Sequence, residues 1–500
     1  MKYVGNVQSQ ANSEVYATAS GALPDGKPVI VNSDGTVSLI SGSRQTQAIG
    51  SNYAFPQMGV GARASHMSAC LDPDRNKIIV AFSRDGPGYA LAVSLSSNLA
   101  FSFGAEQQYE TGTVQYTSIV YDTNSDRVVI SYRDTGNSNK GTAVVGTVNA
   151  DNSISFGTPV VFETGATLGI SSAFDTSSNK VVIGYQDNGN SGYPTAIIGT
   201  VNSSNNSISF GTAVVVKSRV CAYAVVVNDP NAGKIVYIWN DNNSIGTAAV
   251  GTVSNTTISF GTHVEIMVNE AGSGASFGIS DATFKSDTNQ IVVFYQQTGG
   301  TDGTGGYVRV GAISGTDISF GTVKKIAIAA GANSGILRPG VVYDTTSDQL
   351  FLRYLDDALS DKLYATLATV SGTTVTQVGT AFSMNNNAPQ SLGLTTLFDP
   401  NSERIALFFT IGQYGYAEGF TPGFDTLTLT TENFVGITNG AYATGQTATI
   451  QAGGAVNTGQ SSLTAGQQYF IQNDGTLGLT AASPSVIAGT AVSATDLIVK

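Results

Sequence analysis

The chain has 500 residues, of which 41% are hydrophobic and only 12% are charged, and its formal net charge is −12. Lys and Arg number 23 over this length. That is too few for the basic face that nucleic acids or anionic membranes require of a partner. No apolar stretch reaches the length of a membrane span, and the start, Met1–Asn6, lacks the apolar segment of a signal peptide. We therefore expect no nucleic-acid partner, no membrane insertion and no export by a signal peptide.

The N-terminal segment, residues 1–36, and the C-terminal segment, residues 425–500, share a pattern. The stretch Leu23–Val37 reads as a strand, an Asp-Gly hairpin turn and a second strand, and Leu463–Leu477 repeats that order. We expect the two ends of the chain to form one small β module.

Between the ends, residues 37–424 are built from a repeated unit of about 50 to 60 residues, the spacing typical of propeller blades. Each unit has a strand before an Asp turn, an apolar strand, a strand of small residues and a strand with the phrase Ser-Phe-Gly-Thr. Four short antiparallel strands per repeat indicate a propeller blade. In the fifth unit Lys285 replaces the turn Asp. The apolar strand ends in an aromatic residue, ten residues after the turn position, in seven copies: Phe82, Tyr132, Tyr185, Trp239, Tyr295, Tyr354 and Phe409.

The fourth strand is missing after the seventh unit, but Thr46–Ser51 resembles the corresponding Thr376–Thr380. Residues near 44–55 are therefore expected to complete the last blade and to remove two exposed strand edges. The predicted fold is all-β: a seven-bladed β-propeller at 37–424, closed by an N-terminal strand, with a small β module made from 1–36 and 425–500.

The repeated aromatic residues are interpreted as packing between blades, with carbohydrate stacking as the alternative. Their fixed place at the end of an apolar strand favours packing. The same interpretation applies to the phenylalanines of the fourth strands: Phe103, Phe156, Phe210, Phe260 and Phe320.

Histidine and cysteine chemistry has few candidates in this chain. His66 and His263 are the two histidines, and neither has a Cys or His nearby in the sequence with which to form a metal cluster or a triad. Both are interpreted as structural or surface residues. Cys70 and Cys221 fall at different points of the repeat, so we expect two buried free thiols.

Carboxylates are the better candidates for a site. Four blades place an Asp two residues after the aromatic, on what should be one rim of the ring: Asp134, Asp187, Asp241 and Asp356. Asp favours such turns for local hydrogen bonding, and the alternatives are a cation or glycan site or a pair of glycosidase acids. The loops Asp134–Asn139 and Asp187–Gly192 carry oxygen ligands at alternate spacing, a weak calcium pattern that lacks the closing Glu. No other cofactor and no metal site is predicted.

The last 70 or so residues carry a further pattern, including Phe434–Ile437, Ala448–Gln451, Leu463–Gly475 and Ala488–Lys500. This segment resembles the tail of structural, tail-fibre-like proteins of marine tailed bacteriophages, especially cyanophages. The resemblance implies a non-enzymatic virion component, a fibre or surface-attached appendage. Its implied partners are other virion proteins of the capsid or tail, and it is compatible with a homo-oligomer. The second hypothesis is a propeller that binds a host surface glycan or receptor. The third hypothesis, ranked below it, is a glycan-cleaving enzyme.

Overall fold

The computed structural model describes residues 13–500 except 41–43, 46, 57–62, 242–243, 268–275, 301–302, 330–334, 385–392, 426–427, 473–474 and 483–484. It divides into two compact units: Met1–Gln47 together with Gly423–Lys500, and Ala48–Pro422. Antiparallel sheets make up both units, and the prediction of an all-β fold is confirmed. Within the described ranges, no helix is both long and apolar enough to cross a membrane.

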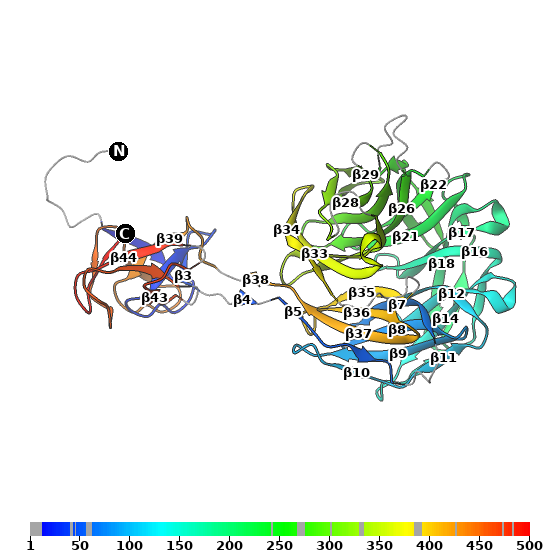
Figure 1. Ribbon diagram of the computed structural model, residues 1–500, viewed down its shortest axis with the longest axis horizontal. Helices are drawn as coiled ribbons and strands as arrows, with labels where there is room; N and C mark the ends of the chain where they lie inside the picture. Colours follow the sequence, from blue (N-terminus) through cyan, green and yellow to red (C-terminus); the bar gives the residue numbers. More distant parts are fainter. Residues whose placement is uncertain are drawn as a thin grey trace. The chain divides into compact units, whose positions relative to one another are not determined.

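The larger unit repeats one series of four strands, each paired antiparallel with the next (Figure 1). The first strands are β7 (Ala64–Asp72), β12 (Val114–Asp122), β16 (Val160–Asp175), β21 (Cys221–Asp229), β26 (Ser276–Lys285), β31 (Ile336–Asp344) and β35 (Leu394–Asp399). The second strands are β8 (Lys77–Arg84), β13 (Arg127–Asp134), β17 (Lys180–Asp187), β22 (Lys234–Asp241), β27 (Gln290–Thr298), β32 (Gln349–Asp356) and β36 (Arg404–Ile411). The third strands are β9 (Gly88–Leu95), β14 (Lys140–Val148), β18 (Tyr193–Asn202), β23 (Gly246–Ser254), β28 (Gly305–Ser314), β33 (Lys362–Ser371) and β37 (Tyr414–Thr421).

The fourth strand of each sheet is short and is often split in two. The pieces are β10 (Phe101–Phe103) with β11 (Gln107–Glu110), β15 (Ile154–Phe156) with the start of β16, β19 (Ser207–Phe210) with β20 (Val214–Val215), β24 (Thr257–Phe260) with β25 (Val264–Glu265), β29 (Asp317–Phe320) with β30 (Lys324–Ile326), and the unsplit β34 (Thr374–Ser383). In the last sheet, β5 (Ala48–Ile49) and β6 (Tyr53–Ala54) pair with β37, the place that fourth strands take elsewhere. Thr46, part of the predicted strand, lies outside the described residues.

The turn Asp explains where the first strand ends. Asp229 accepts hydrogen bonds at one carboxylate oxygen from the N–H groups of Asn231 (3.0 Å) and Ala232 (2.9 Å). These local hydrogen bonds to the Asp side chain take the place of hydrogen bonds between strands. The first strand therefore ends here, and the chain turns back into the second strand. Lys285 takes the same position in the fifth sheet and is buried, with its ammonium bonded to Asp287 and Asp348 (2.6 Å).

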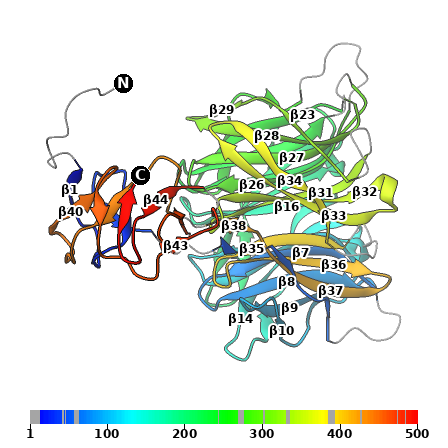
Figure 2. The ribbon, with the colours of Figure 1, turned by 60° about the vertical axis from the view of Figure 1, so that its left-hand side comes forward.

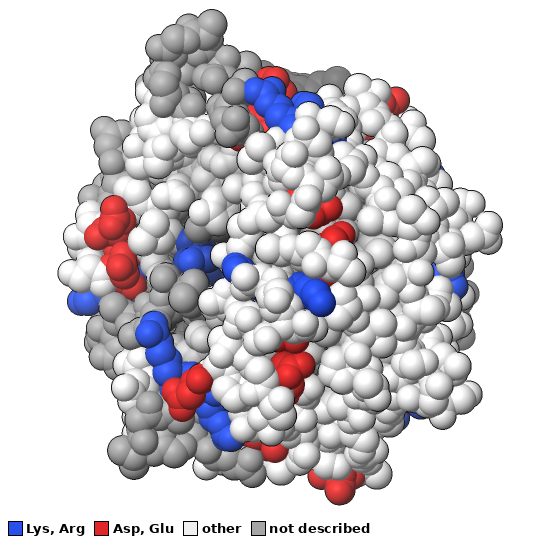
Figure 3. All heavy atoms as spheres, turned by 90° about the vertical axis from the view of Figure 1, so that its right-hand side faces the viewer, with Lys and Arg blue, Asp and Glu red and all other residues white. Residues whose placement is uncertain are grey.

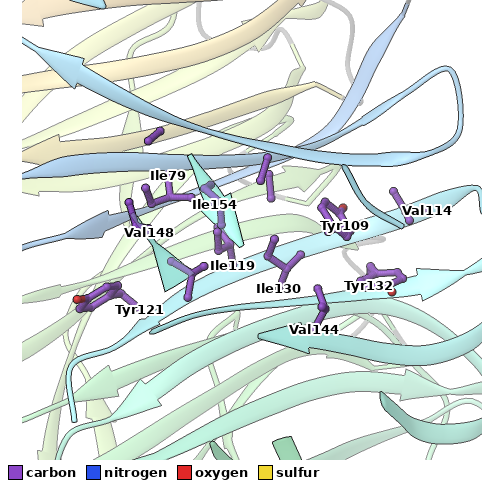
Figure 4. Packing of buried hydrophobic residues seen from close by; sticks show 14 residues of the cluster. Ile79, Tyr109, Val114, Ile119, Tyr121, Ile130, Tyr132, Val144, Val148 and Ile154 are labelled. Carbon is purple, nitrogen blue, oxygen red and sulfur yellow. The ribbon is translucent and has the colours of Figure 1, made fainter. Parts of the chain in front are cut away.

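Each sheet is buried on both faces, and this explains the continuous apolar runs of the second strands. Ile79 of β8 packs toward the second sheet with Ile130 and Val144 (Figure 4). The next residue along the strand, Val80, faces the opposite way and packs with Phe408 of the last sheet. Figures 1 and 2 accordingly show the orange strands of the last sheet beside the blue strands of the first.

The aromatic residues that end the second strands are all buried, and none is more than 1% exposed. The phenylalanines of the fourth strands are only partly buried, which corrects the expectation that they are core residues. Phe156, for example, lies beside Gly146 and 5.8 Å from the ring of Tyr109, whereas Ile154 on the same face is buried. The strand is the outermost of its sheet, so a large ring there keeps part of its surface in solvent. Cys70 and Cys221 are free thiols, the first half-buried and the second buried.

The smaller unit contains the same five-stranded sheet twice. The second copy is continuous: β41 (Val456–Asn457), β42 (Gln468–Ile471), β43 (Leu477–Gly478), β44 (Ile487–Ala491) and β45 (Leu497–Val499), in the spatial order β41-β45-β44-β42-β43. The first copy has the corresponding spatial order β1-β40-β39-β2-β3. Its strands are β1 (Glu14–Thr18), β2 (Pro28–Val31), β3 (Val37–Leu39), β39 (Phe434–Thr438) and β40 (Thr447–Gln451). A short pair, β4 (Arg44–Gln45) with β38 (Phe424–Asp425), follows β3 and precedes β39.

Equivalent hydrogen bonds occur in the two copies. The N–H of Gly26 donates to the carbonyl of Thr438 (3.1 Å), and the N–H of Gly466 donates to that of Ala491 (2.7 Å). Both glycines have a left-handed φ, 68° and 82°. The larger unit is therefore an insertion into the first copy, between β3 and β39, where the second copy has only the segment 479–486.

Candidate functional site

The four rim aspartates predicted from the sequence lie at equivalent positions, each at the end of the second strand of its own sheet, and all are buried. Asp134 and Asp187 cap short 3-10 helices, η1 (Thr135–Asn137) and η2 (Asn188–Asn190), by accepting the N–H of the third residue of the helix (3.0 Å in both). Asp241 accepts the N–H of Ile245 (3.3 Å). Asp356 precedes η3 (Asp357–Leu359) without a side-chain cap.

Burial raises the pKa of Asp134 and of Asp187, and in each case a nearby glutamate raises it further: Glu110 and Glu163 respectively. Each glutamate also accepts a hydrogen bond from a buried tyrosine, Tyr132 (2.9 Å) or Tyr185 (3.0 Å). The four aspartates belong to the second strands of four different sheets. The side-chain oxygens of Asp134 and Asp187 thus serve as local caps, and this geometry explains why Asp occurs there.

One other acidic cluster, Asp72, Asp74 and Asp126, has oxygens close enough to hold a metal ion. The Arg75 guanidinium already lies among them, 2.7 Å from Asp126 and 3.2 Å from Asp72. This arginine holds the pKa of Asp126 well below its usual range. The cluster is an ion pair that links the first two sheets.

A different feature recurs in the first strands: a β-bulge of one extra residue. In β7, Ser65 pairs with Ser83 and Ser68 pairs with Ala81. Between these two pairs the chain therefore advances three residues along β7 but only two along β8. The same irregularity occurs in β12, β16, β21, β26 and β31.

The extra residue of these bulges has a left-handed backbone in five strands. Glycine suits this conformation, because a Cβ atom costs about 1–2 kcal/mol there. Gly169 meets that expectation (φ 53°). The other four strands have a large functional side chain at this position: His66 (φ 49°), Tyr116 (φ 50°), Tyr223 (φ 55°) and Arg338 (φ 49°). Backbone strain of this kind concentrates at functional sites.

These side chains converge on one pocket of about 450 Å³, here called the first-strand pocket. The pocket takes a residue from every first strand from β7 to β35. Tyr116 and Tyr223 remain 37% and 44% exposed. The lining residues that the argument uses are His66, Tyr116, Gly169, Tyr223, Ser280, Arg338 and Leu394.

His66 is held in one tautomer by its neighbour in the next sheet. Its Nδ1 accepts the backbone N–H of Tyr116 (3.3 Å), so in the neutral ring the proton is on Nε2. Burial is the main cause, and together with the positive charges of Arg338 and Arg63 it lowers the pKa of His66 to about 4. The ring is therefore neutral at pH 7 and offers Nε2–H as a hydrogen-bond donor. Its ring lies 5.8 Å from that of Tyr116.

Two more donors of the first-strand pocket are uncommitted. Within the described residues, the guanidinium of Arg338 has no hydrogen-bond or ion-pair partner, and the buried Ser280 hydroxyl has no hydrogen bond. No Asp or Glu is among the described residues that line the pocket. The pocket is rich in donors and lacks carboxylates, so it suits a ligand rich in oxygen atoms.

Sequence reasoning placed His66 among structural or surface residues and did not consider Tyr116, Tyr223 or Arg338. A signal exists in the repeat: all four lie six residues before the turn Asp of their own unit. At that offset the other three units have Gly169, Ile279 and Gly393, so the residue type at this position changes from unit to unit.

Charged side chains are sparse on the face of the larger unit drawn in Figure 3, where most of the surface is neither acidic nor basic. This agrees with the low charged fraction of the chain. Charges of one sign form no broad patch on the described part of that face.

No protein-family model and no curated protein matches the chain. Solved structures do resemble it. The periplasmic gluconolactonase PpgL of Pseudomonas aeruginosa has 10% identity and a TM-score of 0.47, over 74% of this chain and 95% of that one. A putative 6-phosphogluconolactonase from Bacteroides uniformis has 11% identity and a TM-score of 0.45, over 74% and 97%. Saccharomyces cerevisiae Sqt1 has 9% identity and a TM-score of 0.44, over 75% and 98%.

These similarities concern the fold, which is a propeller-like all-β fold. They correct two predictions made from the sequence. Two of the three structures named above are lactonase-type proteins, and this finding contradicts the predictions of a virion structural protein and of a chain that is not an enzyme. The resemblance of the C-terminal segment to phage proteins, a virion location and the partners it implied stay predictions.

Proposed function

We propose that the larger unit is a seven-bladed β-propeller closed by β5 and β6. The pairing of Ile49 with Phe420 and of Ala54 with Tyr416 supports the closure. A hydrogen bond from the Thr410 hydroxyl to the carbonyl of Ala64 (3.0 Å) links the last sheet to the first. The first-strand pocket, lined from β7 through β35, would then lie on the axis of the ring.

We further propose that this pocket is the active site of an enzyme that hydrolyses a small lactone or ester. One observation carries the proposal: four strained bulge positions, on four different first strands, hold His66, Tyr116, Tyr223 and Arg338 rather than glycine, and all four side chains line one pocket. A bulge that served only to shape the strand would be more stable with glycine at this position. A binding site gains four polar groups on rigid strands.

The donor set determines which chemistry is supported. Water attacks the carbonyl carbon of the substrate, and the carbonyl oxygen becomes an oxyanion that accepts a hydrogen bond from His66 Nε2–H. The bond between that carbon and the ring or ester oxygen then breaks. The proton lost by the water ends on the departing oxygen, so that a lactone gives a hydroxy acid and an ester gives a carboxylic acid and an alcohol. Fixed donors aimed at a developing oxyanion are a large source of rate enhancement. Tyr116 and Tyr223 offer hydroxyls and ring faces to the rest of the substrate.

Acid release from δ-gluconolactone and from p-nitrophenyl acetate, measured against buffer, tests this function. We expect acceleration by the wild-type protein and a loss of about 10²- to 10³-fold in His66→Asn, which tolerates the left-handed backbone but lacks the imidazole donor. His263→Asn is the matched control, because this histidine lies against Trp239 (5.4 Å between rings) and not in the pocket. An equal rate in buffer, or full activity of His66→Asn, would overturn the proposal.

A further inference from the structure

Arg338 is the one basic residue among the described residues that line the first-strand pocket, and its charge is uncompensated there. Asp281, a carboxylate of the preceding first strand β26, is already engaged. Its carboxylate accepts the N–H groups of Ala282 (2.9 Å) and Val341 (3.1 Å), and it interacts electrostatically with Arg353. The charge of Arg338 also acts on His66, whose pKa it lowers.

The backbone of Arg338 is fixed where this charge is needed. Its carbonyl accepts a hydrogen bond from Arg353 (2.5 Å), its φ is left-handed, and Pro339 restricts the backbone of Arg338, the residue before it. Arg353 is buried and also donates to Thr396 of the next sheet (2.8 Å). Arg338 is half-buried, and a half-buried charge without a counter-charge is costly, so its retention in this pocket points to an anion as its partner.

We propose that the first-strand pocket selects substrates with a single anionic group, a carboxylate or a phosphate, on a hydroxylated ring, and that Arg338 binds this group. The inference rests on the proposed function and names its substrate class. Tyr116 and Tyr223, which remain 37% and 44% exposed, then face the ring of the substrate. The absence of carboxylates from the described lining removes repulsion of the anion.

Three hexoses that differ only at the sixth carbon test the inference: D-glucuronate with a carboxylate, glucose 6-phosphate with a phosphate, and D-glucose with a neutral hydroxyl. Isothermal titration with the full chain should show at least one anion binding about 10- to 100-fold more tightly than glucose, the size expected for one charge-assisted hydrogen-bonded pair. Which anion binds more tightly separates the carboxylate from the phosphate.

The variant Arg338→Asn keeps a residue that tolerates left-handed φ and removes the charge, so the preference for the anion should disappear. Arg338→Lys keeps the charge and should retain part of it. Equal affinity for glucose and both anions, unchanged anion affinity in Arg338→Asn, or no binding of any of the three would overturn the inference. The lactone assay gives an independent result. If the wild-type protein accelerates lactone hydrolysis but shows no preference for the anions, only the substrate class is rejected. If the wild-type protein does not accelerate hydrolysis, the proposed function is rejected.

Discussion

Replacing Tyr223 by glycine separates a functional side chain from an architectural one. Tyr223 has φ 55° and a side chain that is 44% exposed. Glycine relieves about 1–2 kcal/mol of left-handed strain, and it costs about 0.5–1 kcal/mol through the greater freedom of the unfolded chain. The partly exposed ring loses modest burial. We expect the free energy of unfolding of Tyr223→Gly to stay within about 1 kcal/mol of the wild type.

The comparison variant is Tyr237→Ala in the second strand of the same sheet, because Tyr237 is fully buried. Loss of a buried aromatic side chain costs about 3–5 kcal/mol. Urea denaturation followed by circular dichroism measures both variants, and the titration with the hexose anions measures binding. A loss of 3 kcal/mol or more in Tyr223→Gly, or unchanged ligand affinity at unchanged stability, would refute the argument that the strain at the bulge serves binding.

Three other predictions concern stability. In Gly211→Ala the added Cβ would lie 1.9 Å from a backbone carbonyl oxygen of the next sheet, so we expect a loss of about 2–3 kcal/mol in urea denaturation. Gly335→Ala is the control, with its nearest atom at 3.4 Å, and equal midpoints would contradict the clash. Because the pKa of His66 is about 4 in the folded chain and 6.5 as its ordinary value, the unfolded state binds more protons between these values. Stability should therefore fall as the pH drops from 6.5 to 4, and the fall should be smaller in His66→Asn; parallel pH curves would exclude this contribution. Finally, a chain in which residues 40–433 are replaced by the segment 479–486 should fold as a two-sheet module with a cooperative thermal transition, and a product without one would show that the duplicated sheets depend on the inserted unit.

The four-strand repeat was predictable from local chemistry. An Asp turn such as Asp229 acts through hydrogen bonds to the next few N–H groups, and an apolar run such as Val181–Ile183 reports burial on both faces of its sheet. The aromatic residue ten positions after the turn is buried as expected. The phenylalanines of the fourth strands were misjudged, because their exposure depends on how far the outermost strand projects beyond its neighbours.

The candidate site was not predictable in the same way. The rim aspartates share a position in the repeat, but only the structure shows that Asp134 and Asp187 cap their own loops. Residues such as His66 and Arg338 lie hundreds of positions apart in the chain, and the tertiary structure brings them to one pocket.

The amino-acid sequence alone predicted the four strands of the repeated unit and the shared pattern of the two ends, because these follow from turns and alternation over a few residues. The tertiary structure decided which side chains meet, since that depends on register. One extra residue in a first strand reverses the side-chain alternation and turns His66, Tyr116, Tyr223 and Arg338 toward a common space. The register depends on how one strand pairs with another, so it cannot be predicted from a short stretch of sequence.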